Sequence, residues 1–82
     1  MNIQDEIISK IKLFSEEMTF KMIDNVMEKG DSWKKSHNSW LRRKLLENFE
    51  CGNWVDVANY AFMLDDKKRE KTLRALEKVL EK

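Results

Sequence analysis

The stretch that decides the fold runs from Glu47 to Leu64 and reads ENFECGNWVDVANYAFML. Wound as a helix at about 100° per residue, its second half, from Trp54 onward, is apolar on nearly every side. A helix of this kind is normally buried, by its own domain or by a partner chain. Asp56 and Asn59 interrupt it, and their i,i+3 spacing places both on one narrow strip. Because unpaired burial of polar groups is costly, the pair predicts either hydrogen bonds to a neighbouring helix end or one wall of a polar site for a cation or a ligand.

The composition indicates one small helical domain. The 82 residues include 38% charged and 41% hydrophobic residues, no proline and two glycines, Gly30 and Gly52, which is typical of helices joined by short turns. A domain of this size buries only about 60% of the surface of its unfolded chain, and oligomerisation often supplies the missing burial. We therefore expect a single all-α domain over residues 1–82 that assembles as a dimer or higher oligomer.

Charge and cysteine content limit the class of protein. The formal net charge of +1 gives no electrostatic case for binding to nucleic acid or to a membrane surface. The single cysteine, Cys51, excludes an internal disulfide framework and favours an intracellular protein. No apolar run approaches the roughly 18 residues that a membrane span needs, and the N-terminus lacks a signal-peptide pattern. The prediction is a cytoplasmic protein with no membrane and no nucleic-acid partner.

Residues 3–29 are predicted to form one long helix, or two that meet at a bend near Ser15. The apolar stripe follows helical spacing, and further apolar residues beside it widen the apolar surface. Extra apolar width on a small protein indicates contact with a second chain, although methionines also serve as ordinary core filling. Lys29 followed by Gly30 is the expected end of the helix. The stripe consists of Ile3, Ile7, Ile11, Phe14, Met18, Met22, Ile23, Val26 and Met27, and Ile8, Leu13 and Phe20 lie outside it.

Residues 31–39 are rich in turn formers and show no helical stripe. Trp33 beside Lys34 and Lys35 has two interpretations: the ring stacks on a base while lysine holds a phosphate, or the ring packs over the edge of the core. His37 is the only histidine and has no neighbouring ligand residue, so a metal role for it is not expected.

A short helix is predicted from an N-cap at Asn38 or Ser39 to about Cys51, with a buried stripe of Leu41, Leu45 and Phe49. Glu47 and Glu50 are i,i+3 neighbours on the opposite side. They form either a solvated face with an Arg43–Glu47 pair or two carboxylates aimed at a hard cation such as Mg²⁺.

Gly52 closes that helix and Asn53 caps the next one, which makes a tight helical hairpin. Residues 66–82 are strongly helical, with Leu73, Leu76, Val79 and Leu80 as their apolar face, and nothing between 54 and 82 breaks a helix. Basic and acidic residues largely alternate there, which indicates a solvated face. The predicted architecture is three to four helices: a long N-terminal helix, a helical hairpin and a C-terminal helix.

Three segments carry a family resemblance: VMEKGDSWKK, WLRRKLLENFE and WVDVANYAFML. Together they resemble the MazG-like, all-α nucleoside triphosphate pyrophosphohydrolases over about residues 22–65, and DVANYAFML is the most specific part. The resemblance implies a dimer or tetramer of helices in which carboxylates bind Mg²⁺ and the metal engages the phosphates of a nucleotide.

Carried over residue by residue, the resemblance implies metal-binding and catalytic roles for Glu47, Glu50 and Asp56. It places Asn59 at the asparagine that follows the acidic residue of the third helix. Asn53 stands where the family has a second acid in that helix, and the spacing between Glu50 and Asn53 is much shorter than in the family. Ligands from another subunit would therefore be needed to complete the cage. The candidates for substrate binding are Lys29, Trp33, Lys34, Lys44 and Asn59.

The functional hypotheses are three. The first is a compact MazG-like pyrophosphohydrolase that uses Mg²⁺ to polarise a phosphoryl group and activate water. The second is a module that binds or sequesters a nucleotide without hydrolysing it. The third is a structural helical oligomer that acts through protein–protein contacts.

Overall fold

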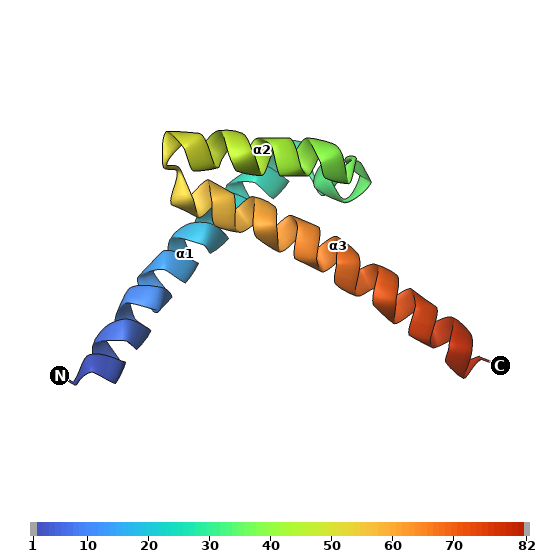
Figure 1. Ribbon diagram of the computed structural model, residues 1–82, viewed down its shortest axis with the longest axis horizontal. Helices are drawn as coiled ribbons and strands as arrows, with labels where there is room; N and C mark the ends of the chain where they lie inside the picture. The colour runs from blue at the N-terminus through green and yellow to red at the C-terminus, as the bar shows by residue number, and fades with distance from the viewer. Residues whose placement is uncertain (1, 82) are drawn as a thin grey trace.

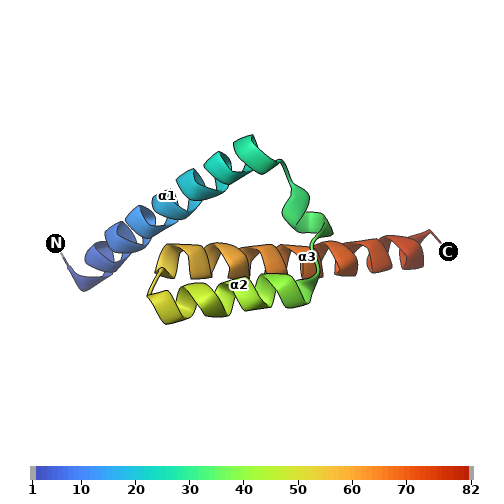
Figure 2. The same ribbon diagram turned by 90° about the horizontal axis from the view of Figure 1, so that it is seen from above.

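The computed structural model describes residues 2–81 and is entirely helical in its regular structure, as the sequence predicts. The helix α1 spans Ile3–Lys29, a 3₁₀ turn η1 spans Ser32–Lys35, α2 spans Asn38–Cys51 and α3 spans Trp54–Leu80. Figure 1 shows α2 lying along the first half of α3, while α1 crosses α3 and the two chain ends point away from each other. Figure 2 shows that α2 and α3 run in opposite directions.

The helix ends follow from local chemistry. The Asn2 side chain accepts a hydrogen bond of 2.9 Å from the backbone N–H of Asp5 and so caps α1. Gly30 ends α1 with φ 65° and ψ −151°, a conformation that is essentially restricted to glycine. Gly52 ends α2 in the left-handed region, where its N–H bonds back to carbonyls of that helix. Both glycines therefore act as predicted.

Two predicted N-caps differ from the structure. The cap position of α2 is His37, so Asn38 and Ser39 already lie inside the helix. In the described part of the chain, residues 2–81, no side chain caps that end. Asn53 does occupy the cap position of α3, but its amide donates to Asn48 Oδ1 at 3.3 Å instead of accepting from the helix. No bend divides α1 near Ser15, and α3 is continuous from Trp54 onward.

The core is a small apolar junction to which every element contributes. Its fully buried centre is Leu41 of α2, and Trp33 of η1 and Met63 of α3 pack around it. Met22 of α1 and Tyr60 of α3 lie against this group. The Trp33 and Phe62 rings are tilted at 52° with centroids 6.2 Å apart, which extends the junction along α3.

The apolar surface outside this junction is largely uncovered within one chain. Trp54 and Phe62 of α3 are half exposed, and in α2 Leu45 is half-buried while Phe49 remains exposed. Of the two ways in which the segment 54–64 was expected to be buried, its own domain supplies only part, since α1 and α2 cover part of its circumference; burial by a partner chain remains a prediction. Neither 27-residue helix offers a stretch apolar enough to cross a membrane, and the same holds for all helices of residues 2–81.

The junction predicts a large stability difference between two leucines. We expect Leu41→Ala to lower the free energy of unfolding by about 2–5 kcal/mol, because it leaves a cavity where all elements meet. Leu80→Ala, at an exposed position near the end of α3, should change it by less than about 0.5 kcal/mol. Urea denaturation of the two variants measures both values, and equal midpoints would contradict the assignment of the core.

Candidate functional site

A polar pocket of about 270 Å³ lies between α1 and α3. Two methionines and a tyrosine form its apolar side, next to the core junction. Its polar wall carries three carboxylates and one lysine, a formal charge of −2. The polar residues are Lys21, Asp24, Asn25 and Glu28 of α1 with Asp56 and Asn59 of α3.

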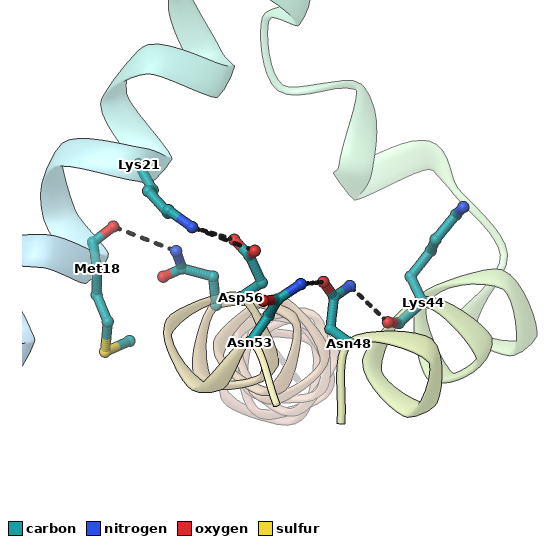
Figure 3. Close-up of polar contacts among 7 residues, drawn as sticks. Met18, Lys21, Lys44, Asn48, Asn53 and Asp56 are labelled. Atoms are coloured by element: carbon teal, nitrogen blue, oxygen red, sulfur yellow. Dashed lines mark hydrogen bonds and ion pairs between the residues drawn. The ribbon is translucent and has the colours of Figure 1, made fainter. Parts of the chain in front are cut away.

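An ion pair between α1 and α3 lies at this pocket. Lys21 Nζ donates to both carboxylate oxygens of Asp56 at 3.2 Å, as Figure 3 shows. The Lys21 side chain is 55% exposed and that of Asp56 is 32% exposed. Solvent therefore screens the pair, and we assign it at most about 1 kcal/mol of stability. The Lys21 ammonium nonetheless occupies both carboxylate oxygens of Asp56, which are the atoms that a metal ion would bind.

Asn59 is the buried polar residue of the site, with 5% of its surface exposed. Its Nδ2 donates to the backbone carbonyl of Met18 in the middle of α1, at 3.3 Å. Because a carbonyl only accepts, this contact also determines the orientation of the amide. The other amide atom, Oδ1, is buried and has no hydrogen-bond partner among residues 2–81. An orphaned buried acceptor costs about 1–3 kcal/mol, which a donor from outside the chain would recover.

The sequence left two interpretations of Asp56 and Asn59: hydrogen bonds to a neighbouring helix, or one wall of a polar site. The structure contains the hydrogen bonds, which both residues form with α1. The contacts reach the middle of α1, at Met18 and Lys21, whereas a helix end was expected. Both residues also line the pocket, so the prediction of a polar wall is compatible with the same geometry.

The predicted metal ligands are not brought together within one chain. Glu47 lies on the exposed side of α2, where Lys44 Nζ contacts it at 3.2 Å and Arg43 Nε at 4.0 Å. Glu50 is also exposed on α2, whereas Asp56 faces Lys21 of α1. Within residues 2–81, no three histidine, cysteine or acidic side chains lie close enough together to hold a metal ion. Glu47, Glu50 and Asp56 do not fit a magnesium cage formed by this chain alone.

The predicted substrate-binding residues are dispersed. Trp33 is 8% exposed and sits in the core junction, so its ring is not free to stack on a base. Of its two sequence interpretations, packing against the core describes the structure. Lys44 is engaged by Glu47 and lies over the Trp40 ring. Lys29 is exposed at the last residue of α1, and Lys34 is exposed on η1 with Asp31 3.9 Å away.

The polar residues of α1 at the pocket were missed by the sequence reasoning. A signal for them exists, because the stripe of Ile7, Ile11, Phe14 and Met18 continues at helical spacing into Lys21, Asn25 and Glu28. The side of α1 that is apolar in its first half therefore becomes polar where α3 crosses it. In this chain the change coincides with the place where Asp56 and Asn59 of α3 contact α1.

Comparison of the chain with models of protein families, with curated proteins and with solved structures finds no match. The resemblance to MazG-like pyrophosphohydrolases remains a prediction from the sequence.

The Lys21–Asp56 pair makes a testable prediction. We expect Asp56→Asn and Lys21→Met each to destabilise the protein by at most about 1 kcal/mol, and the double variant by little more than either single variant. A urea double-mutant cycle, run with Mg²⁺ and again with chelator, measures this coupling. Destabilisation should be independent of metal. A metal-free Asp56→Asn protein that is more stable than the wild type would instead reveal repulsion among carboxylates of a metal site.

Proposed function

We propose that this chain is a non-catalytic, MazG-like nucleotide-binding protein that works as an oligomer. The observation that carries the proposal is the buried Asn59 Oδ1, which has no partner among residues 2–81 and belongs to a residue that lines the α1–α3 pocket. A buried acceptor in such a place is satisfied when a ligand or a neighbouring subunit supplies a hydrogen-bond donor.

The chemistry of the pocket suits the nucleoside part of a nucleotide. Asp24, Glu28 and Asp56 add carboxylate acceptors to the amide oxygen of Asn59. Ribose hydroxyls and the amino groups of bases are donors, so they complement an acceptor-rich wall. The apolar side, formed by methionine and tyrosine side chains, offers a surface for the flat face of a base. The phosphates would point away from the carboxylates, toward exposed cations such as Lys29.

Binding without hydrolysis is favoured by the ion pair at the pocket. A pyrophosphohydrolase of the resembled family needs several carboxylates on one metal, and here Lys21 already neutralises Asp56. Mg²⁺-dependent hydrolysis is the competing function, and it requires Glu47 and Glu50 of another subunit to approach Asp56. Both glutamates are exposed on α2, which leaves them accessible to such a partner.

The oligomer is supported by the amount of apolar surface that one chain leaves uncovered. The radius of gyration is 16.0 Å, whereas a compact domain of this length has about 12 Å. The first half of α1 continues the apolar stripe beyond the crossing with α3, so Ile3, Ile7 and Ile11 remain exposed. The last part of α3 exposes a further apolar face. A dimer or tetramer would bury these surfaces, since an apolar stripe that one chain leaves exposed is typical of an interface with another chain.

Nucleotide binding is tested by thermal shift and calorimetry with nucleosides and nucleoside triphosphates, in the presence and absence of Mg²⁺. We expect at least one nucleotide to raise the unfolding midpoint without Mg²⁺, because a ligand of the native state stabilises it. Asn59→Leu should abolish that shift, whereas Asn53→Leu, an amide outside the pocket, should preserve it. Pyrophosphate release that depends on Mg²⁺ would establish the competing hydrolase, and a panel without any shift would contradict nucleotide binding.

Assembly is tested by sedimentation equilibrium at micromolar concentration. We expect a mass that is a multiple of 9.9 kDa for the wild-type chain. Ile7→Glu places a charge on the exposed apolar stripe of α1 and should dissociate the oligomer. Lys12→Glu, on the same helix outside that stripe, should leave the mass unchanged. A stable wild-type monomer would contradict this part of the proposal.

A further inference from the structure

The second half of α3 carries a stripe of cations that is not apparent from the net charge. Lys67, Lys71, Arg74 and Lys78 are separated by four, three and four residues, so they share one side of the helix over about 16 Å. The acidic residues Glu70, Glu77 and Glu81 are separated by seven and four residues, which places them together on an adjacent side. The alternating charges of this segment are therefore sorted into separate stripes once the helix is wound.

The basic stripe faces a groove and not a flat surface. Together with Lys34 and Lys35 of η1, it lines a groove of about 680 Å³ between η1 and α3. Six cations oppose two carboxylates there, Asp31 and Glu70, which leaves a formal charge of +4 in a chain whose whole net charge is +1. Lys67 Nζ donates to the backbone carbonyl of Ser36 and so ties the end of η1 to α3.

Most of these cations are not engaged by carboxylates of the chain. Lys34 lies 3.9 Å from Asp31, and Arg74 lies 4.0 Å from Glu70, which are long contacts at exposed positions. Lys35, Lys67, Lys71 and Lys78 form no ion pair with any carboxylate of residues 2–81. The basic surface also continues past Lys67 into a second hollow that Arg42 and Lys68 line. Its one carboxylate, Asp65, is bound by Arg69 at 2.6 Å, and this contact raises the pKa of the guanidinium.

Helix electrostatics do not account for the stripe. Cations near the C-terminus of a helix interact favourably with its dipole, but the effect is confined to the last turn. That explanation covers Lys78 alone, whereas Lys67 and Lys71 lie two to three turns further in. Like charges gathered in a groove repel one another, so the arrangement favours an anion that lies between them.

We propose that the groove between η1 and the second half of α3 binds a linear chain of phosphate groups, as in a nucleoside triphosphate or inorganic polyphosphate. Lysine ammonium groups act as point charges that accept a phosphate in many orientations, which suits a flexible chain. The stripe is long enough for several successive phosphates, and cations of η1 face the same chain from the other wall. The site is separate from the α1–α3 pocket and does not depend on nucleotide binding there.

The absence of a stacking surface favours bare phosphates over single-stranded nucleic acid. Proteins that bind single strands combine a basic groove with aromatic side chains on which the bases stack. Among residues 2–81 no aromatic side chain lines this groove, and Trp33, the nearest in sequence to Lys34, is packed in the core. The ligand is therefore recognised by its charge and spacing alone.

Calorimetric titration with sodium tripolyphosphate, ATP and a longer inorganic polyphosphate tests the proposal on the full chain. The four lysines of the groove that form no ion pair within residues 2–81 are counted as four phosphate contacts. By the counterion relation for single strands, raising the salt from about 50 to about 200 mM should then weaken binding of the longer chain about fiftyfold. Lys71→Gln with Lys78→Gln removes two contacts, so binding should be weaker and the salt effect should fall to about sevenfold. The matched control, Lys10→Gln with Lys12→Gln on α1, loses the same charge and should behave as the wild type.

The arms of the experiment separate the possible ligands. ATP that binds no tighter than tripolyphosphate identifies the free phosphate chain as the ligand. Tighter ATP binding that the Lys71→Gln with Lys78→Gln variant weakens identifies the phosphates of a nucleotide, and both outcomes support the groove. Tighter ATP binding that this variant leaves unchanged belongs to the α1–α3 pocket, and tripolyphosphate alone then decides for or against the groove. The proposal is overturned if no phosphate compound binds, or if the α1 control loses as much affinity as the α3 variant. It is also overturned if a thymidine oligonucleotide of equal charge binds as tightly as polyphosphate. Failure of the Asn59→Leu test would leave these outcomes unaffected.

Discussion

The packing around Leu41 is the contact on which the rest of the structure depends. Trp33 of η1 and Met63 of α3 share a buried cluster with Leu41, and Met22 of α1 packs against that cluster, so a few residues set the relative positions of all four elements. The stabilisation from hydrophobic burial is proportional to the apolar area removed from water. An 82-residue chain with such a small junction removes little of this area. The first half of α1 and the last part of α3 extend beyond the junction and gain no support from the rest of residues 2–81 (Figure 1).

Both candidate binding sites lie at the edges of this junction. The α1–α3 pocket shares Met22, Tyr60 and Met63 with it, while the basic groove begins next to Trp33. The core therefore acts as the rigid support for two polar surfaces of opposite charge. One surface is acceptor-rich and negative, and the other is positive. A chain that is nearly neutral overall thus presents two strongly charged local surfaces.

The helices were predictable because their signals are local. Gly30 and Gly52 need a positive φ and end their helices, and the absence of proline allows two helices of 27 residues. The extent of burial was not predictable from the same pattern. An apolar circumference around residues 54–64 indicates that some surface must cover it, but periodicity does not distinguish a surface of the same chain from that of another.

The sequence predicted only those residues of the candidate site that carry a local signal. Asp56 and Asn59 stand out because they interrupt an apolar segment, and both line the pocket. Lys21, the partner of Asp56, is one lysine among many, and only the crossing of α1 over α3 selects it. Glu47 and Glu50 were chosen by their i,i+3 spacing and by resemblance, and the structure leaves both exposed on α2, outside the α1–α3 pocket. The stripe on α3 was overlooked because net charge and residue alternation both average over the direction in which side chains project.

The unequal lengths of α2 and α3 have a consequence for dynamics. The 14 residues of α2 extend about 21 Å, whereas α3 extends about 40 Å, so the hairpin ends halfway along the longer helix. Every residue of the segment 71–81 is exposed. A helical segment this short is marginal in water unless something packs against it. Its amide protons would therefore exchange through local opening that leaves the junction intact, while those near Met63 would exchange only on global unfolding. The continuous helix α3 would then belong to two cooperative units. The outer unit, residues 71–81, would be ordered only when a bound partner or ligand packs against it.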